Sequence, residues 1–125
     1  MPKVSKTSAT KVTDIGIGQI HEDTVDGYEV AFLDLREEVD MAGLLQGLPD
    51  DLCPCPHWGY VTAGRVTFTF RDHTEEFTAG DAFHVEGGHS PAVSAGTSWL
   101  LFSPADEMAV VNETIERNLV AMQSA

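Results

Sequence analysis

Short segments of alternating hydrophobic and polar residues dominate the middle of the chain. The clearest example is residues 65–71, where Val66, Phe68 and Phe70 alternate with polar side chains. This period of two is typical of a strand with one buried face. Glycine-containing turns separate the segments, and we predict strands at residues 11–20, 28–35, 57–62, 65–71, 74–77, 81–86, 89–93 and 97–102. Short, closely spaced strands predict an all-β fold, a barrel or a sandwich, because a βαβ sheet would need helices between its strands.

Two further segments follow the period of a helix. Asp40 can cap a short connector helix at residues 41–48, whose apolar side chains share one face. Ser103 and Pro104 suit the start of a C-terminal helix, which we predict at residues 104–122. Its apolar stripe consists of Met108, Val111, Ile115, Leu119 and Met122. The stripe must pack on the end of the barrel or on a second subunit. Together with the exposed edge of the first strand, it leads us to predict a homodimer.

The length of 125 residues suits one domain, because two cores of half that size would each be marginal. We predict a flexible polar tail at residues 1–12 and a single barrel domain, with its C-terminal helix, at residues 13–125. No apolar run approaches the roughly 20 residues that span a membrane, and the N-terminus lacks the apolar segment of a secretory signal. We therefore expect a cytoplasmic protein that does not enter membranes.

The charge of the chain narrows the choice of partner. Acidic residues outnumber basic residues by 20 to 7, which gives a formal net charge of -13. This charge repels phosphate backbones and leaves no basic stripe to bind them. We therefore expect no nucleic-acid partner, and we predict a small-molecule ligand in the pocket of the barrel.

The segment Cys53-Pro-Cys-Pro-His57 carries the most informative chemistry. Cys53, Cys55 and His57 have equal parity, so in an extended strand all three side chains project from one face. Thiolates and an imidazole are suitable ligands for zinc, iron or copper. Pro54 and Pro56 favour polyproline II instead, which would splay these side chains so that only one cysteine joins His57. A third interpretation treats both cysteines as small buried hydrophobic residues.

A second segment, residues 80–91, supplies further candidates. After a Gly-Asp turn and a short apolar strand, two glycines permit a tight reversal that returns His89 to the barrel. We take His89 as the additional metal ligand. His84 and Glu86 share parity within the strand, so both are candidates for acid–base catalysis if that face points into the pocket.

These residues also carry a resemblance to a known family. The turn Tyr60-Val-x-x-Gly64, the Gly80-Asp81 pair that follows it by sixteen residues, and the Gly-His reversal at His89 resemble the two conserved motifs of the cupin superfamily. The similarity covers about residues 48–104 and is strongest to small, single-domain bacterial members. It implies a cupin-type antiparallel β-barrel, the double-stranded β-helix or jelly roll.

The ligand positions of those motifs are not reproduced. His57 stands where the family has its glutamate, and the two histidines of the first motif fall near Asp51 and Cys53. In the second motif Glu86 replaces a proline, and Pro91 occupies the usual histidine position. The resemblance therefore implies the fold but neither the metal nor the reaction, because cupins include dioxygenases, isomerases, lyases and metal-free proteins.

Our leading hypothesis is a small cupin that binds one divalent transition metal, zinc, iron or copper, and acts on a small organic molecule. His57, His89 and Cys53 or Cys55 would hold the metal. Whether the protein is an enzyme, and of which type, stays open. The alternatives are a metal-free module that binds a small molecule among aromatic residues, namely Phe68, Phe70, Phe83, Trp58 or Trp99, and a redox-responsive thiol pair.

Overall fold

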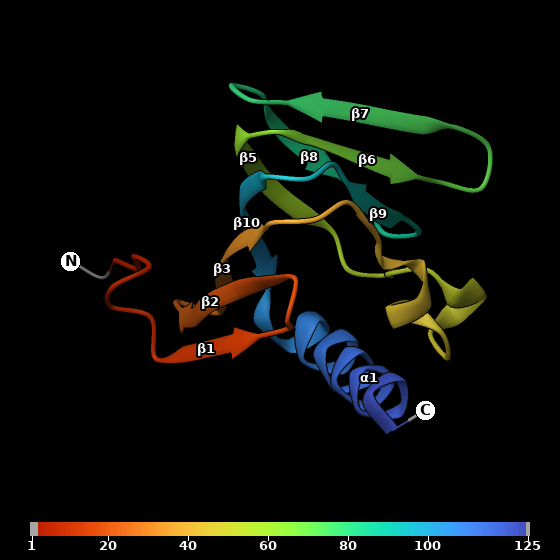
Figure 1. Cartoon of the computed structure of the whole chain (residues 1–125), viewed down its shortest axis with the longest axis horizontal. Coiled ribbons are helices and arrows are strands. Elements are labelled where there is room, and N and C mark those ends of the chain that lie inside the picture. Colours follow the sequence, from red (N-terminus) through yellow and green to blue (C-terminus); the bar gives the residue numbers. More distant parts are fainter. Residues whose placement is uncertain (1–2, 125) are drawn as a thin grey trace.

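Two antiparallel sheets face each other in residues 3–124, the part of the chain that this computed structural model describes (Figure 1). The larger sheet has the strand order β1-β2-β3-β10-β5-β8, and the smaller has the order β4-β9-β6-β7. The strands are β1 (Lys11–Asp14), β2 (Gly18–Val25), β3 (Tyr28–Leu35), β4 (Val39–Asp40), β5 (His57–Ala63), β6 (Arg65–Thr69), β7 (Thr74–Thr78), β8 (Ala82–Val85), β9 (Ser90–Val93) and β10 (Thr97–Pro104). Two 3₁₀ helices, η1 (Met41–Leu45) and η2 (Pro49–Asp51), precede β5, and the helix α1 (Ala105–Ser124) follows β10. The predicted jelly-roll architecture of antiparallel strands with a C-terminal helix is confirmed.

Residues 11–20 contribute to two strands, so the prediction of a single strand there is wrong. The chain reverses between β1 and β2, where Gly16 has a positive φ of 85° and its N–H donates to Asp14 Oδ1 at 2.8 Å. Strand β2 then continues to Val25 and pairs with β3 along its whole length. The hydrophobic pattern does not indicate this turn, because isoleucines on both sides of it continue the apolar pattern. Strand β1 begins at Lys11, inside the predicted tail, whose flexibility stays a prediction.

The inner faces of the two sheets form the core. In β6, Val66 and Phe68 are fully buried and Thr69 is exposed, as the alternation predicts. The ring of Phe68 lies 5.5 Å from that of Phe83 and 5.9 Å from that of Trp99, centroid to centroid. Aromatic rings at such distances bury large apolar areas and interact favourably.

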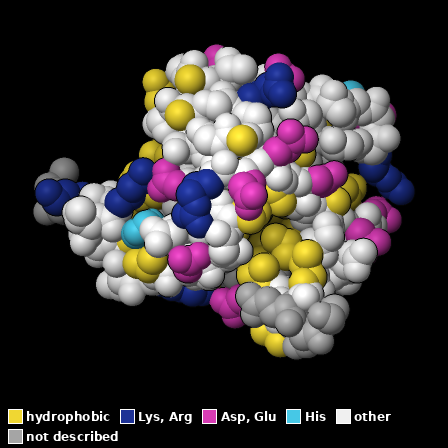
Figure 2. Space-filling model, viewed as in Figure 1, with side chains coloured by type: hydrophobic (Ala, Val, Ile, Leu, Met, Phe, Trp, Pro, Cys, Tyr) yellow, Lys and Arg dark blue, Asp and Glu magenta, His cyan; other side chains and the backbone are white. Residues whose placement is uncertain are grey.

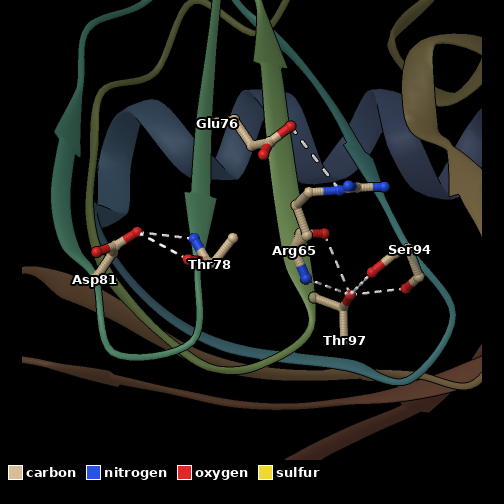
Figure 3. A network of polar contacts seen from close by, with 6 residues as sticks. All are labelled: Arg65, Glu76, Thr78, Asp81, Ser94 and Thr97. Carbon is tan, nitrogen blue, oxygen red and sulfur yellow. Dashed lines mark hydrogen bonds and ion pairs between the residues drawn. The ribbon is translucent and has the colours of Figure 1, made fainter.

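Hydrogen bonds close the end of the sandwich at which β10 begins (Figure 3). Thr97 Oγ1 accepts from the Arg65 N–H at 3.1 Å and donates to the Ser94 carbonyl oxygen at 2.7 Å. Gly64 has a positive φ of 78°, and a Cβ there would lie 2.3 Å from Thr97 Oγ1. The turn therefore requires glycine. Strand β10 leads from this closed end to α1.

The connector is shorter than predicted and has 3₁₀ geometry. Asp40 caps η1 as expected, because its Oδ1 accepts from the Ala42 N–H at 2.9 Å. The helix ends at Leu45, shortly before Gly47, whose φ of 100° is incompatible with a continuing helix. Its apolar face is buried, as the sequence pattern indicates.

The apolar stripe of α1 packs against the same chain through Met108, Val111, Ile115 and Leu119, whereas Met122, the last residue of the predicted stripe, is 60% exposed. Val111 is fully buried in a cluster that includes Leu45, and Asn118 Nδ2 donates to a connector carbonyl oxygen at 2.7 Å. Of the two partners that the stripe allowed, the barrel side is therefore occupied, and the homodimer stays a prediction. The helix begins at Ala105 because Pro104 still pairs in β10. No helix within the described chain combines the length and the hydropathy needed to cross a membrane.

Candidate metal centre

A cavity of about 110 Å³ lies beside α1, between the larger sheet and the connector. Most of its walls are apolar, and they include Leu33, Leu101 and Ile115. On the face shown in Figure 2, hydrophobic side chains gather in a hollow beside α1. The wall also contains polar and ionisable side chains, among them Cys53, His57, His89, Ser103, Glu22, Glu29, Lys11 and Glu116. A ligand in this cavity would therefore meet both apolar surface and a small number of polar groups.

Three side chains of residue types that can ligate metals converge in this cavity. Cys53, His57 and His89 are all buried, and their ligand atoms lie within 4.8 Å of one another. Cys53 Sγ is 3.6 Å from His57 Nε2, and the two imidazole centroids are 4.9 Å apart. One thiol and two imidazoles form a donor set that suits zinc, iron or copper. The arrangement could hold one such ion.

Backbone pairing brings His89 next to Cys53. The Cys53 N–H donates to the His89 carbonyl oxygen at 2.8 Å, and the Gly88 N–H donates to the Cys53 carbonyl oxygen at 2.7 Å. Gly87 lies so close to the segment before β5 that a Cβ there would be 2.1 Å from Pro54 O. Gly87 thus permits the close approach to the cysteine segment, and Gly88, with a positive φ of 95°, permits the tight reversal that the sequence indicates.

Hydrogen bonds orient both imidazoles. His89 Nδ1 lies 2.7 Å from the Glu86 carbonyl oxygen. Because a carbonyl oxygen only accepts, Nδ1 carries the proton and Nε2 presents a lone pair. Within the described part of the chain, His89 Nε2 is buried and has no hydrogen-bond partner. His57 Nδ1 lies 2.7 Å from Ser103 Oγ, which directs His57 Nε2 toward Cys53. Histidines that bind metals typically have their second nitrogen held in this way.

Burial sets the protonation states of the three groups. It lowers the pKa of His57 to about 3, with a further contribution from His89, and it lowers the pKa of His89 as well. Both imidazoles are therefore neutral at pH 7, which is the form that binds metals. Burial raises the pKa of the Cys53 thiol to about 11. A metal ion that binds Cys53 must therefore displace its proton.

Cys55 is not part of this group. Its side chain is fully buried in the apolar cluster with Leu45, Leu48 and Val111, and its Sγ donates to the Pro56 carbonyl oxygen at 3.4 Å. Burial raises the pKa of this thiol to about 12. Of the alternatives that the sequence left open, the structure shows the one in which a single cysteine joins His57. Cys55 occupies the position of a small hydrophobic residue.

His84 and Glu86 lie outside the cavity. Along β8 the side chains alternate so that Phe83 and Val85 are buried and His84 is exposed, with its ring centroid 4.7 Å from that of Trp58. Glu86 is exposed too, and only its backbone carbonyl reaches the site. The acid–base role predicted for both residues depended on their facing the pocket. The parity of the strand turns that face outward, so the condition is not met, and the role itself stays a prediction.

Two features of the site escaped the sequence analysis. Ser103, interpreted as a helix cap, is buried in β10 and hydrogen-bonds to His57. Glu29 lies on the inner face of β3 with Leu33 and Leu35. The sequence pattern that could have indicated the burial of Ser103 is the alternation along its strand, because Ser103 lies on the same face as Trp99 and Leu101.

Comparisons with known proteins identify the architecture. No protein-family model and no curated protein sequence matches the chain. Among solved structures, a variant of Bacillus subtilis oxalate decarboxylase has a TM-score of 0.60 and 15% identity, over 81% of this chain and 28% of that chain. The polyketide cyclase RemF from Streptomyces resistomycificus has a TM-score of 0.56 and 17% identity, over 84% and 80%. Salmonella typhimurium EutQ, described as an ethanolamine utilization protein, has a TM-score of 0.51 and 14% identity, over 70% of each chain.

The chain has a cupin fold. It spans just over a quarter of the oxalate decarboxylase chain that it resembles. At these identities the likeness concerns the fold alone. In this chain the fold brings Cys53, His57 and His89 together as a buried group.

Proposed function

We propose that this cupin-fold protein binds one divalent transition metal through Cys53, His57 and His89, and acts on a small organic molecule held in the adjoining cavity. The observation that carries the proposal is the convergence of three buried donors within 4.8 Å of one another. The two histidines also have their other nitrogens held by hydrogen bonds at 2.7 Å, as a metal site requires.

Three protein ligands leave a coordination position for a further ligand. In catalytic zinc sites that position takes water or substrate, whereas structural sites are closed by a fourth protein side chain. The three donors line the cavity, so a small molecule there would have access to the open position. When bound, the metal would supply Lewis acidity toward an oxygen atom of that molecule.

A metal-free binding module is the second candidate function. The observation in its favour is the mainly apolar cavity wall, to which Trp99 contributes. Of the other aromatic residues considered, Trp58 is exposed on the outer face of the sheet. Chelator treatment separates the two candidates, because only the metal protein should lose thermal stability when chelated.

Metal analysis of matched cysteine variants tests the proposal. We expect protein purified without an affinity tag, and supplied with zinc, iron or copper, to contain about one metal ion per chain. Cys53→Ala should lose that metal, whereas Cys55→Ala should keep it because Cys55 lies outside the donor group. Cobalt substitution should add thiolate-to-metal absorption that is absent from Cys53→Ala. Wild-type protein without stoichiometric metal, or equal metal content in the two variants, would overturn the proposal.

A further inference from the structure

Three glutamates that the proposed metal centre does not use line the same cavity, and two of them, Glu22 and Glu29, are buried. Glu22 is 9% exposed and Glu29 is 8% exposed, and they lie on the inner faces of the neighbouring strands β2 and β3. Glu22 pairs with Ala31, which is two residues from Glu29, so the two carboxyl side chains are diagonal neighbours on one face. Buried carboxylates are costly unless they are paired with positive charge, so their presence needs an explanation.

The charges around this pair do not balance. Lys11 Nζ is 3.3 Å from Glu22 Oε1, but it is closer, at 2.8 Å, to Glu116 Oε1 on α1. Glu29 Oε1 accepts a hydrogen bond from Asn112 Nδ2 at 2.8 Å, which is a neutral donor. Among the described residues at this site, three carboxyl groups therefore share one ammonium group.

This excess of carboxyl groups affects the pKa of Glu29. Burial, together with a hydrogen bond and charge repulsion from Glu22, raises the pKa of Glu29 to about 8. At neutral pH a proton thus occupies the place that a positive counter-ion would otherwise take. An incoming cation could replace that proton.

Another polar group in the cavity also lacks a partner. Trp99 lines the cavity and is 3% exposed, and its Nε1 is buried without an acceptor in the described part of the chain. Buried indole N–H groups usually have a partner, so an oxygen atom of a ligand is a suitable acceptor. This observation is independent of the glutamates, and it indicates that the cavity is built for a ligand with polar atoms.

We propose that Glu22 and Glu29 recognise the ammonium group of a small organic amine whose apolar body fills the cavity and whose oxygen acceptor faces Trp99. The proposal rests on the proposed function in one respect, namely that this cavity is the substrate site. The ammonium group of the ligand would contact Glu22 and Glu29, neither of which is a proposed metal ligand. Glu29 pairs across the strands with Ser103, which hydrogen-bonds to His57, so the amine would be held beside the metal centre.

Binding changes the protonation of Glu29 in a defined way. The amine arrives as an ammonium ion, the Glu29 carboxylic acid releases its proton to the buffer, and no covalent bond to the ligand forms. The complex then holds one ammonium group against the Glu22 and Glu29 carboxylates, while Lys11 stays paired with Glu116. Amine binding at pH 7 should therefore release up to one proton per chain.

Calorimetric titration with a matched pair of probes tests this inference. The probes are 4-amino-1-butanol and 1,4-butanediol, which differ in whether an ammonium or a hydroxyl group stands at one end. We expect the amine to bind about tenfold or more tightly than the diol, because the loss of a charge-assisted hydrogen bond has an effect of that size. Titrations in two buffers with different ionisation enthalpies should report the proton release on wild-type protein.

Isosteric variants locate the binding. Glu29→Gln and Glu22→Gln should each weaken amine binding about tenfold, and Glu29→Gln should abolish the proton release. Glu113→Gln, which changes an exposed glutamate on α1, should bind the amine as wild type does. Circular dichroism should confirm that each variant is folded. If a variant does not fold, the probe comparison and the proton count on wild-type protein still decide the question.

Titrations of metal-loaded and chelator-treated protein separate this inference from the metal proposal. Stoichiometric metal with no preference for the amine in either form would overturn the ammonium site and leave the metal proposal intact. If the protein takes up no stoichiometric metal when metal is supplied, but still binds the amine with proton release, the ammonium site is supported and the metal proposal is rejected. Equal binding of amine and diol, or unchanged amine binding in Glu29→Gln, would also overturn the inference.

Discussion

Ser103→Ala offers a direct test of how the protein holds His57. Ser103 Oγ lies 2.7 Å from His57 Nδ1, and both side chains are buried. Alanine removes the hydroxyl group without adding volume, so His57 Nδ1 is left in the interior without this partner. The substitution should affect the metal-free fold and the metal site in different ways.

The expected magnitudes follow from these contacts. A buried polar atom that loses its hydrogen bond costs about 1–3 kcal/mol, so the free energy of unfolding of the metal-free protein should fall by that amount. Loss of the group that orients a metal-binding histidine typically weakens metal binding about 10–100-fold. That change corresponds to about 1.4–2.7 kcal/mol in binding free energy.

Two assays measure these quantities separately. Urea unfolding of chelator-treated protein gives the stability, and competition with a chromophoric chelator gives the zinc affinity. Ser98→Ala is the matched control, because Ser98 lies in the same strand but bonds to Asp34 on the outer face. If folded Ser103→Ala binds zinc within twofold of wild type, then Ser103 does not position His57 for a metal.

Three other substitutions test the fold and the electrostatics. The pKa of Glu29 in the folded protein is about 8, above its usual value, so the free energy of unfolding should decline as pH rises from about 4.5 to 8. Glu29→Gln should flatten that decline and raise the free energy of unfolding at pH 8 by more than about 1 kcal/mol. Urea unfolding that gives wild type and variant the same dependence on pH would contradict this. Gly87→Ala places a Cβ 2.1 Å from a backbone oxygen and should lower the melting temperature and the bound metal, whereas Gly43→Ala meets no atom within 4 Å and should melt near wild type. Val111→Ala should lower the free energy of unfolding by about 2 kcal/mol, because Val111 is fully buried. Val110→Ala should lower it by less than about 0.5 kcal/mol, because Val110 is 60% exposed. Similar losses in the two variants would show that α1 does not pack as described.

Local patterns predicted most of the strands but not all of their borders. The alternation at residues 65–71 identifies β6 because the period of two depends only on neighbouring residues. The turn at Gly16 was missed because its neighbours are apolar, and what separates β1 from β2 is the pairing of β2 with β3. The end of β10 was misplaced for the same reason, since Pro104 remains in a strand through its pairing with Tyr28.

The kinds of donor available and the alternation of buried and exposed residues in the strands can be read from short segments of the sequence, because both are local properties. The sequence placed Cys53, Cys55 and His57 together, but it could not choose between an extended strand and polyproline II. The three-dimensional fold places Cys53 next to His89 through a backbone bridge and packs Cys55 under α1. It likewise turned His84 outward and brought Glu29 into the cavity. Pairing between segments far apart in the chain sets which face of a strand is buried, and no local pattern contains that pairing.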